Sequence, residues 1–69
     1  MGSDKIQISL AAARVNAGYT QESAAKALHI SKATLISWEK GKSEPKTSQA
    51  RQISDLYGMP YDAIIFLPS

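Results

Sequence analysis

The sequence predicts an all-α domain built as a compact five-helix bundle. Apolar residues recur at helical spacing in five segments, and residues that start or stop helices bound these segments. No segment alternates apolar and polar residues as a half-buried strand does. The connections are short, as they are in closely packed helical domains. These observations favour helices packed around one core.

The first predicted helix covers residues 8–17 and is rich in alanine. Gly18 follows it and can adopt the left-handed conformation that ends many helices. The second and third helices begin after Thr20 and Ser31, whose hydroxyls can accept from free N–H groups of the first turn. The residues expected to face inward from these three helices are Leu10, Ala13, Ala17, Ala24, Ala25, Leu28, Leu35 and Trp38.

The last two predicted helices complete the bundle. Thr47 is expected to cap the fourth helix, and Gly58 is expected to end it. Its inward stripe consists of Ala50, Ile53 and Tyr57. A short fifth helix is expected to begin at residue 60 or 61 and to continue through residue 65 or 66.

Length and composition indicate one small domain. The chain has 69 residues, of which 43% are hydrophobic and 20% are charged, as in globular proteins. We assign residues 6–67 to the domain and residues 1–5 to a tag remnant and flexible N-terminus. No apolar run approaches the ~18 residues of a membrane span, and cysteine is absent, so a cytoplasmic protein is expected.

Positive charge gathers in the middle of the chain. Residues 31–51 hold five basic residues against two acidic ones, whereas residues 52–69 hold only Asp55 and Asp62 as charged residues. A solvated basic face would have a similar composition. Because the charge coincides with the third predicted helix and the loop after it, we favour a surface that faces phosphates.

The segment from residue 20 to residue 41 contains the most specific pattern. Two short helices joined by a tight turn are the layout of a module that places its second helix in the DNA major groove. The residues Gly18-Tyr19-Thr20-Gln21-Glu22, Ala25, Ile30-Ser31-Lys32-Ala33-Thr34-Leu35, Trp38-Glu39-Lys40-Gly41-Lys42 and Pro45 resemble the phage repressor and Cro type helix-turn-helix, or XRE family. The resemblance covers about residues 6–66.

This resemblance implies a lambda-repressor-like fold and a function. It implies a phage or bacterial transcriptional regulator, more commonly a repressor, that binds double-stranded DNA with a recognition helix at about residues 32–39. The side chains that it places at base edges are Lys32, Ala33 and Ser37, with Ile36 beside them. A small polar residue is usual at position 36, so Ile36 is expected against thymine methyl groups, a neighbouring loop or no partner.

A second group of residues is expected at the DNA backbone. Its members are Gln21, Thr34, Lys40, Lys42, Ser43 and Lys46. Gln21 lies in the first turn of its helix, where the partial positive charge also favours a phosphate, although a solvated surface amide is the alternative. The hydroxyl of Thr34 is expected either at a phosphate or on a carbonyl of its own helix.

Five residues are expected to support the recognition helix. They are Arg14, Glu39, Trp38, Leu35 and Ala25. The resemblance implies an ion pair between Arg14 and Glu39, which would tie the first helix to the recognition helix. Trp38 is expected in the core because it shares a stripe with Leu35.

Besides Ile36, two more positions depart from the pattern of the resembled family. His29 stands where glycine is usual in the turn, so it is expected to adopt positive φ under strain or to alter the turn. Ala24 replaces a larger aliphatic residue. Either Phe66 or Tyr57 fills the space, or the core is underpacked there.

The carboxyl end raises the question of a dimer. The four consecutive residues Ile64, Ile65, Phe66 and Leu67 present more apolar surface than one short helix can bury, so we expect some of them to meet a second copy in a homodimer on DNA. The alternatives are that Phe66 and Leu67 fold back onto the domain, or that the chain is part of a longer regulator.

A different class of function also fits the predicted fold. An antitoxin or adaptor would use the apolar tail or a groove to hold a protein partner. Enzymatic activity is not expected, because the sequence has no paired acids, no Ser-His arrangement and no phosphate-binding glycine loop. Neither a metal site nor a cofactor is expected.

Overall fold

A computed structural model describes residues 8–65 of the chain. Within this range the elements follow in the order β1 (Ile8–Ser9), α1 (Leu10–Asn16), α2 (Gln21–Leu28), α3 (Lys32–Glu39), α4 (Thr47–Tyr57), the 3-10 turn η1 (Tyr61–Ala63) and β2 (Ile64–Ile65). The described part of the chain is therefore mostly helical, with four α-helices. The expected tag remnant at residues 1–5 lies outside it.

The first helix is shorter than predicted, because its first two residues form a strand. Ser9 caps α1, and its hydroxyl accepts from the Ala12 N–H at 3.1 Å. At the other end, Ala17 caps the helix and Gly18 follows with φ of 87°. Leu10 and Ala13 are buried as predicted, whereas Ala17 is only partly buried.

The predicted fifth helix is wrong. Residues 61–63 form a single 3-10 turn, and Ile64–Ile65 then pair in parallel with Ile8–Ser9. In this register Ile8 lies opposite Ile64 and Ser9 lies opposite Ile65. β-branched residues favour extended backbone, and the pairing satisfies backbone groups at both ends of the described chain. The domain thus contains a two-stranded sheet that the all-α prediction missed.

The fourth helix begins and ends nearly as predicted. Its N-cap is Lys46, not Thr47, and the Lys46 N–H donates to Gln49 Oε1 at 2.8 Å. Gly58 ends the helix with φ of 68°, in the left-handed region that glycine adopts without steric cost. The Ser54 hydroxyl donates to the Met59 carbonyl just beyond this end.

The core lies between all four helices and β2. Its buried residues are Leu10, Ala13, Ala24, Ala25, Leu28, Leu35, Trp38, Ile53, Tyr57 and Ile64. Leu35 and Ile53 are its largest fully buried side chains. Ala24 is buried in the same cluster as Tyr57, one of the two residues expected to compensate for its small size, whereas Phe66 lies outside the described residues.

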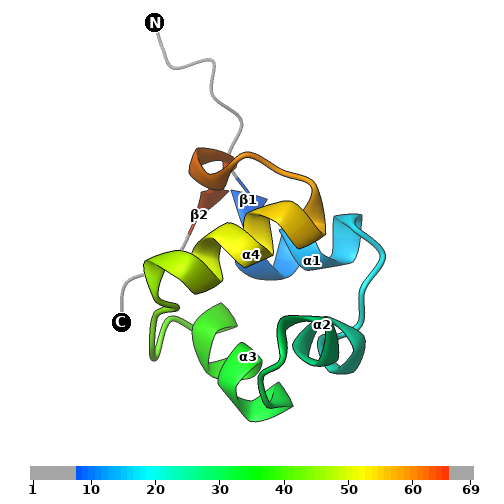
Figure 1. Cartoon of the computed structure of the whole chain (residues 1–69), viewed down its shortest axis with the longest axis vertical. Helices are drawn as coiled ribbons and strands as arrows, with labels where there is room; N and C mark the ends of the chain where they lie inside the picture. Colours follow the sequence, from blue (N-terminus) through cyan, green and yellow to red (C-terminus); the bar gives the residue numbers. More distant parts are fainter. Residues whose placement is uncertain (1–7, 66–69) are drawn as a thin grey trace, which may run out of the picture.

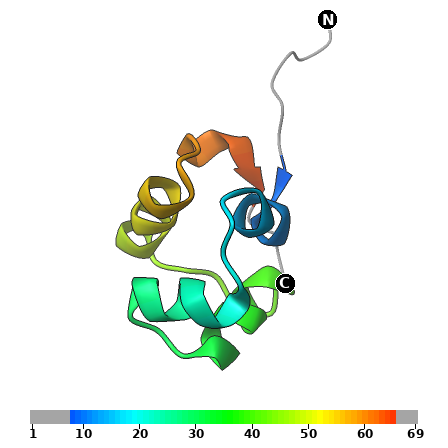
Figure 2. The same cartoon turned by 90° about the vertical axis from the view of Figure 1, so that its right-hand side faces the viewer.

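The helix pair α2 and α3 occupies one end of the molecule. Figure 1 shows η1 and the short sheet at the opposite end, with α1 and α4 between them, and Figure 2 shows the same order from the side. α2 and α3 pack against each other closely, since the facing residue Ala25 is small and 3% exposed. This end carries the residues for which the sequence predicts DNA contacts.

Candidate nucleic-acid interface

The start of α3 is held by a hydroxyl cap. The Thr34 N–H donates to Ser31 Oγ at 3.0 Å, as predicted for an N-cap serine. The Thr34 hydroxyl lies 2.8 Å from the same Ser31 oxygen. The Thr34 hydroxyl therefore bonds to the Ser31 hydroxyl, a partner that differs from both expected ones, a phosphate and a carbonyl of its own helix.

α3 presents one side to the core and another to solvent. Leu35 is 0% exposed and Trp38 is 6% exposed, so the stripe that contains them is the buried one. On the other side Lys32 and Ala33 are exposed. Ile36 and Ser37 are half-buried, at the border between the two sides. None of the four residues predicted to meet base edges is packed into the core.

The turn before α3 has the backbone conformation expected from the position of His29. This residue caps the end of α2 with φ of 60° and ψ of 41°, in the left-handed region. It is the one non-glycine residue with positive φ among residues 8–65. The Ile30 N–H then donates to the Ala25 carbonyl at 3.0 Å, which closes the turn and sets the direction of α3.

The end of α3 is joined to α1 and α2 by a buried carboxylate. Arg14 Nε donates to Glu39 Oε2 at 2.8 Å, and the two side chains are 13% and 6% exposed. Gln21 Nε2 donates to the other oxygen, Oε1, at 3.0 Å. The ion pair is the one implied by the resemblance, whereas the bond to Gln21 was not predicted.

Tyr57 from α4 lies close to this ion pair. Burial, with a smaller contribution from the negative charge of Glu39, raises the pKa of the Tyr57 hydroxyl to about 12, while the positive charge of Arg14 acts in the opposite direction. The hydroxyl is buried and has no hydrogen-bond partner among the described residues. Its ring packs against Tyr19, with ring centroids 5.9 Å apart.

The loop after α3 carries most of the predicted phosphate contacts. Lys40, Lys42, Ser43 and Lys46 are all exposed. The Lys42 N–H donates to the Ser37 carbonyl at 3.0 Å, and the hydroxyls of Ser37 and Ser43 lie 2.8 Å apart. A residue predicted to meet bases and one predicted to meet phosphates are thus joined directly, which holds the loop against α3.

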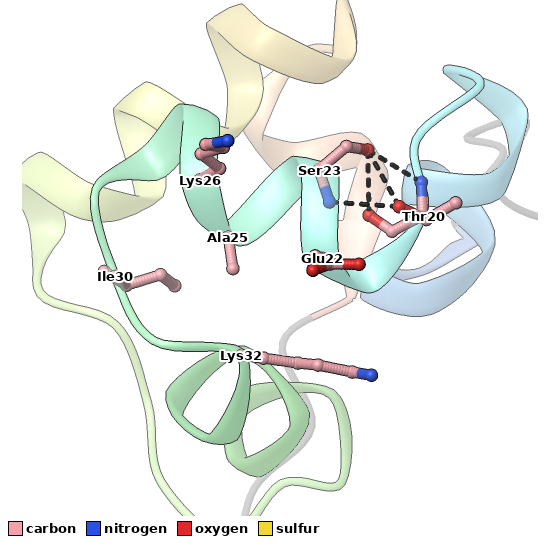
Figure 3. Close-up of a pocket in the computed structure, with 7 residues that line it drawn as sticks. All are labelled: Thr20, Glu22, Ser23, Ala25, Lys26, Ile30 and Lys32. Atoms are coloured by element: carbon pink, nitrogen blue, oxygen red, sulfur yellow. Dashed lines mark hydrogen bonds between the residues drawn. The ribbon is translucent and has the colours of Figure 1, made fainter.

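A groove lies between α2 and the start of α3. It has a volume of about 490 Å³ and is lined by Thr20, Glu22, Ser23, Ala25, Lys26, Ile30 and Lys32. Figure 3 shows Ala25 and Ile30 pointing into this space, with Lys32 extending along its edge. Glu22 and Lys26 were not predicted here, although their spacing of four residues places them on one helix face. Because the negative charge of Glu22 offsets the positive charges of Lys26 and Lys32, the groove is not a uniformly positive site for an anion.

Across residues 8–65, the structure contains no group of three or more metal-ligating side chains. No helix in this range is long and apolar enough to cross a bilayer.

Comparison with known protein families assigns the chain to a family. A helix-turn-helix family model matches residues 10–64, from the first residue of α1 to the first residue of β2. The chain belongs to the Cro and XRE type helix-turn-helix family. No curated protein and no solved structure matches the sequence.

Membership of this helix-turn-helix family defines the class of function. The family consists of DNA-binding regulatory domains and is not an enzyme family. The chain is therefore a DNA-binding transcription regulator whose partner is double-stranded DNA. Within the helix-turn-helix, α2 is the first helix and α3 is the second.

Proposed function

We propose that this domain recognises a specific DNA sequence by inserting α3 into the major groove, and that it acts as a repressor. The observation that carries the proposal is the exposed side of α3. Lys32 and Ala33 are open to solvent while Leu35 and Trp38 hold the opposite side in the core. A helix anchored in this way presents its first turn to base edges.

The chemistry of the exposed side favours a small number of base contacts. Lys32 can donate to guanine O6 or N7, Ala33 can contact a thymine methyl group, and Ser37 can donate or accept. Ile36 is half-buried, so only part of its side chain is open to a thymine methyl group. Shape and deformability of the DNA then supply part of the discrimination.

Phosphate contacts from two segments complete the proposed interface. Gln21 begins α2, and the exposed residues Lys40, Lys42, Ser43 and Lys46 lie between α3 and α4. Thr34 belongs to the same group, although its hydroxyl already contacts Ser31. Bound across a promoter, such a domain represses by excluding polymerase.

We further propose that two copies bind DNA on half-sites about one helical turn apart, ~34 Å. The predicted dimer segment needs one correction. Ile64 is 4% exposed and belongs to the domain's own core, so it is not available to a partner. The side chain of Ile65, together with Phe66 and Leu67, lies outside the described residues, and a contact through these three remains part of the proposal.

Selection of bound duplexes from a random pool, at two salt concentrations, tests the proposed function. We expect an enriched sequence with two related half-sites, and a slope of log K on log salt of about −0.9 for each neutralised phosphate. A flat slope without an enriched sequence would contradict the proposal.

Two variants with a matched control separate base contacts from phosphate contacts. Lys32→Ala should relax the preference at one base pair and cost about 1–3 kcal/mol of binding. Lys42→Ala should weaken binding to all sequences alike and reduce the salt slope by about 1. Arg51→Ala removes one positive charge from the exposed side of α4, outside the proposed contacts, and should change neither quantity much.

A further inference from the structure

The carboxylate of Glu39 accepts from two side chains on two other helices. Arg14 from α1 donates to Oε2 at 2.8 Å, and Gln21 from α2 donates to Oε1 at 3.0 Å. The Glu39 side chain is 6% exposed, so this contact lies where water competes little. A charged acceptor in such a place makes a strong hydrogen bond to a neutral amide.

The other end of the ion pair is held as well. The Nη1 of Arg14 donates to the Tyr19 carbonyl at 2.9 Å, just before the Thr20 cap of α2. Arg14 therefore joins the backbone at the entry to α2 and the carboxylate at the end of α3. Gln21 is the first residue of α2, so both the backbone before it and its side chain are tied to the same pair.

The bond to Glu39 determines how the Gln21 amide is turned. An ionised carboxylate only accepts, so the NH₂ group of Gln21 faces Glu39 and its Oε1 faces away. One of the two N–H hydrogens is used by Glu39, and the second remains available to another acceptor. A glutamine side chain has large rotamer entropy, and an amide already held in one rotamer loses less of it on binding.

We infer that Glu39 is a positioning residue for DNA binding, acting through Gln21. The partly buried Arg14–Glu39 pair holds the Gln21 amide in the orientation in which its free N–H meets a DNA phosphate. This inference rests on the proposed phosphate contact of Gln21. It adds a role in DNA binding to the structural role of the ion pair, which joins α1, α2 and α3.

A purely structural pair and a positioning pair predict different results. If the pair only joins helices, its removal raises Kd by the same factor for every duplex in the series, whichever phosphate is neutral. If it positions Gln21, its removal abolishes the contribution of the one phosphate that Gln21 contacts. Replacing single phosphates of the bound duplex by neutral methylphosphonates measures this contribution phosphate by phosphate.

The test compares four proteins on this series of duplexes. The first is the unmodified chain, and the second is Gln21→Ala. The third is the double variant Arg14→Met with Glu39→Met, in which no buried charge is left unpaired, because replacing both ions of a buried pair by apolar groups is often tolerated. The fourth is this double variant with Gln21→Ala added. Thermal melting of each protein identifies a temperature at which all four are folded.

In the unmodified chain, a methylphosphonate at the Gln21 phosphate should raise Kd about tenfold, as expected for a hydrogen bond to a charged group. Gln21→Ala should abolish this effect. The double variant should abolish it too, and adding Gln21→Ala to the double variant should cause no further loss of affinity. The rise in Kd caused by a methylphosphonate at the Lys42 phosphate is the internal control, and it should persist in all four proteins.

Two other results would overturn the inference, and they are distinguishable. If Gln21→Ala abolishes the effect and the double variant retains it, Gln21 contacts the phosphate without help from Glu39. If Gln21→Ala changes no single position, the proposed contact itself fails, and the inference fails with it.

If the double variant does not fold, Glu39→Gln replaces it. The new amide oxygen would face the charged Arg14, and its NH₂ group would then face the NH₂ group of Gln21. The same loss at the Gln21 phosphate is expected, and its retention would contradict the inference.

Discussion

Tyr57 shows how one side chain can both stabilise the core and weaken it. Its ring lies in the core cluster and packs against Tyr19, which removes a large apolar area from water. Its hydroxyl is buried and lacks a partner among the described residues. A buried polar group without a hydrogen bond loses its hydration and gains nothing in return.

Tyr57→Phe should therefore stabilise the domain. Removing the unpaired hydroxyl should raise the free energy of unfolding by about 1 kcal/mol. In a domain of this size, that corresponds to an increase in Tm of about 4–8 °C, measurable by circular dichroism. Affinity for DNA should not change, because Tyr57 is not among the proposed contacts. A lower Tm would show that the hydroxyl has a partner, such as an internal water molecule.

The same hydroxyl should make stability depend on pH in the alkaline range. Burial, with a smaller contribution from Glu39, raises its pKa from 10.0 to about 12 in the folded protein. The folded state then keeps this proton where the unfolded state loses it. The contribution of this proton to the free energy of unfolding is fully present below about pH 10. It is lost as the pH rises to about 12, and the total loss is roughly 2–3 kcal/mol.

Urea unfolding between pH 9 and pH 12 measures this dependence. Other groups also titrate there, so the informative quantity is the difference between the unmodified chain and Tyr57→Phe. The unmodified chain should lose stability more steeply with rising pH. Parallel curves for the two proteins would contradict the raised pKa.

At the scale of elements, the turn between α2 and α3 sets the direction of α3, the proposed recognition helix. His29 occupies the left-handed conformation there, with φ of 60°. For an L-residue with a side chain, this conformation costs about 1 kcal/mol. The closing bonds of the turn and the packing of α2 on α3 offset that cost.

His29→Gly should stabilise the domain by about 0.5–1 kcal/mol. Glycine adopts positive φ without the steric cost, although it loses more entropy on folding, so the gain is smaller than the strain itself. His29→Val is the matched comparison and should destabilise, because a β-branched residue is strongly disfavoured there. Urea unfolding of both variants measures these differences. A glycine variant less stable than the unmodified chain would mean that the imidazole makes a contact worth more than the strain.

The turn also shows what the sequence could predict. The caps at Thr20 and Ser31 depend on a few neighbouring residues, and the sequence predicted both. For His29 the resemblance left two alternatives, positive φ under strain or an altered turn, and the structure has the positive φ. The fifth helix was wrong because Ile64–Ile65 pair with Ile8–Ser9, more than fifty residues away. A short run of apolar residues is compatible with either a helix or a strand, and only the distant partner decides between them.

In the candidate interface, too, the sequence predicts the features that depend on neighbouring residues and misses those that depend on how distant segments pack. Exposure of Lys32 and Ala33 and burial of Leu35 and Trp38 follow from helical periodicity within α3. The bonds from Gln21 to Glu39 and between Ser37 and Ser43 join side chains from different segments. Their existence depends on how α2, α3 and the following loop pack together, which residue spacing alone does not determine.

At the scale of the whole molecule, the sheet and the proposed DNA-binding face lie at opposite ends. β1 and β2 bring together residues from the two ends of the described chain, while α3 lies at the far end (Figures 1 and 2). Leu10, Leu35 and Ile64 all belong to one core cluster. The two ends are therefore stabilised by the same core, and a small domain of this kind is expected to unfold in one step.

Ile64→Ala tests this coupling. Truncation of a buried isoleucine leaves a cavity and should cost about 2–4 kcal/mol, a large share of the stability of a domain this small. Val15→Ala is the control, because Val15 is 62% exposed on α1 and its truncation should cost less than about 0.5 kcal/mol. Chemical unfolding followed by tryptophan fluorescence reports on Trp38 in α3, and circular dichroism reports on all the helices.

If the core is shared, both signals of Ile64→Ala should shift together to lower urea concentration. The shift should appear at Trp38 even though residue 64 lies at the other end of the molecule. At a temperature where the variant is folded, its affinity for DNA should equal that of the unmodified chain, because α3 and its supporting contacts are unchanged. Two separate transitions, with fluorescence unaffected, would mean that the sheet end unfolds on its own and that the DNA-binding end does not depend on it.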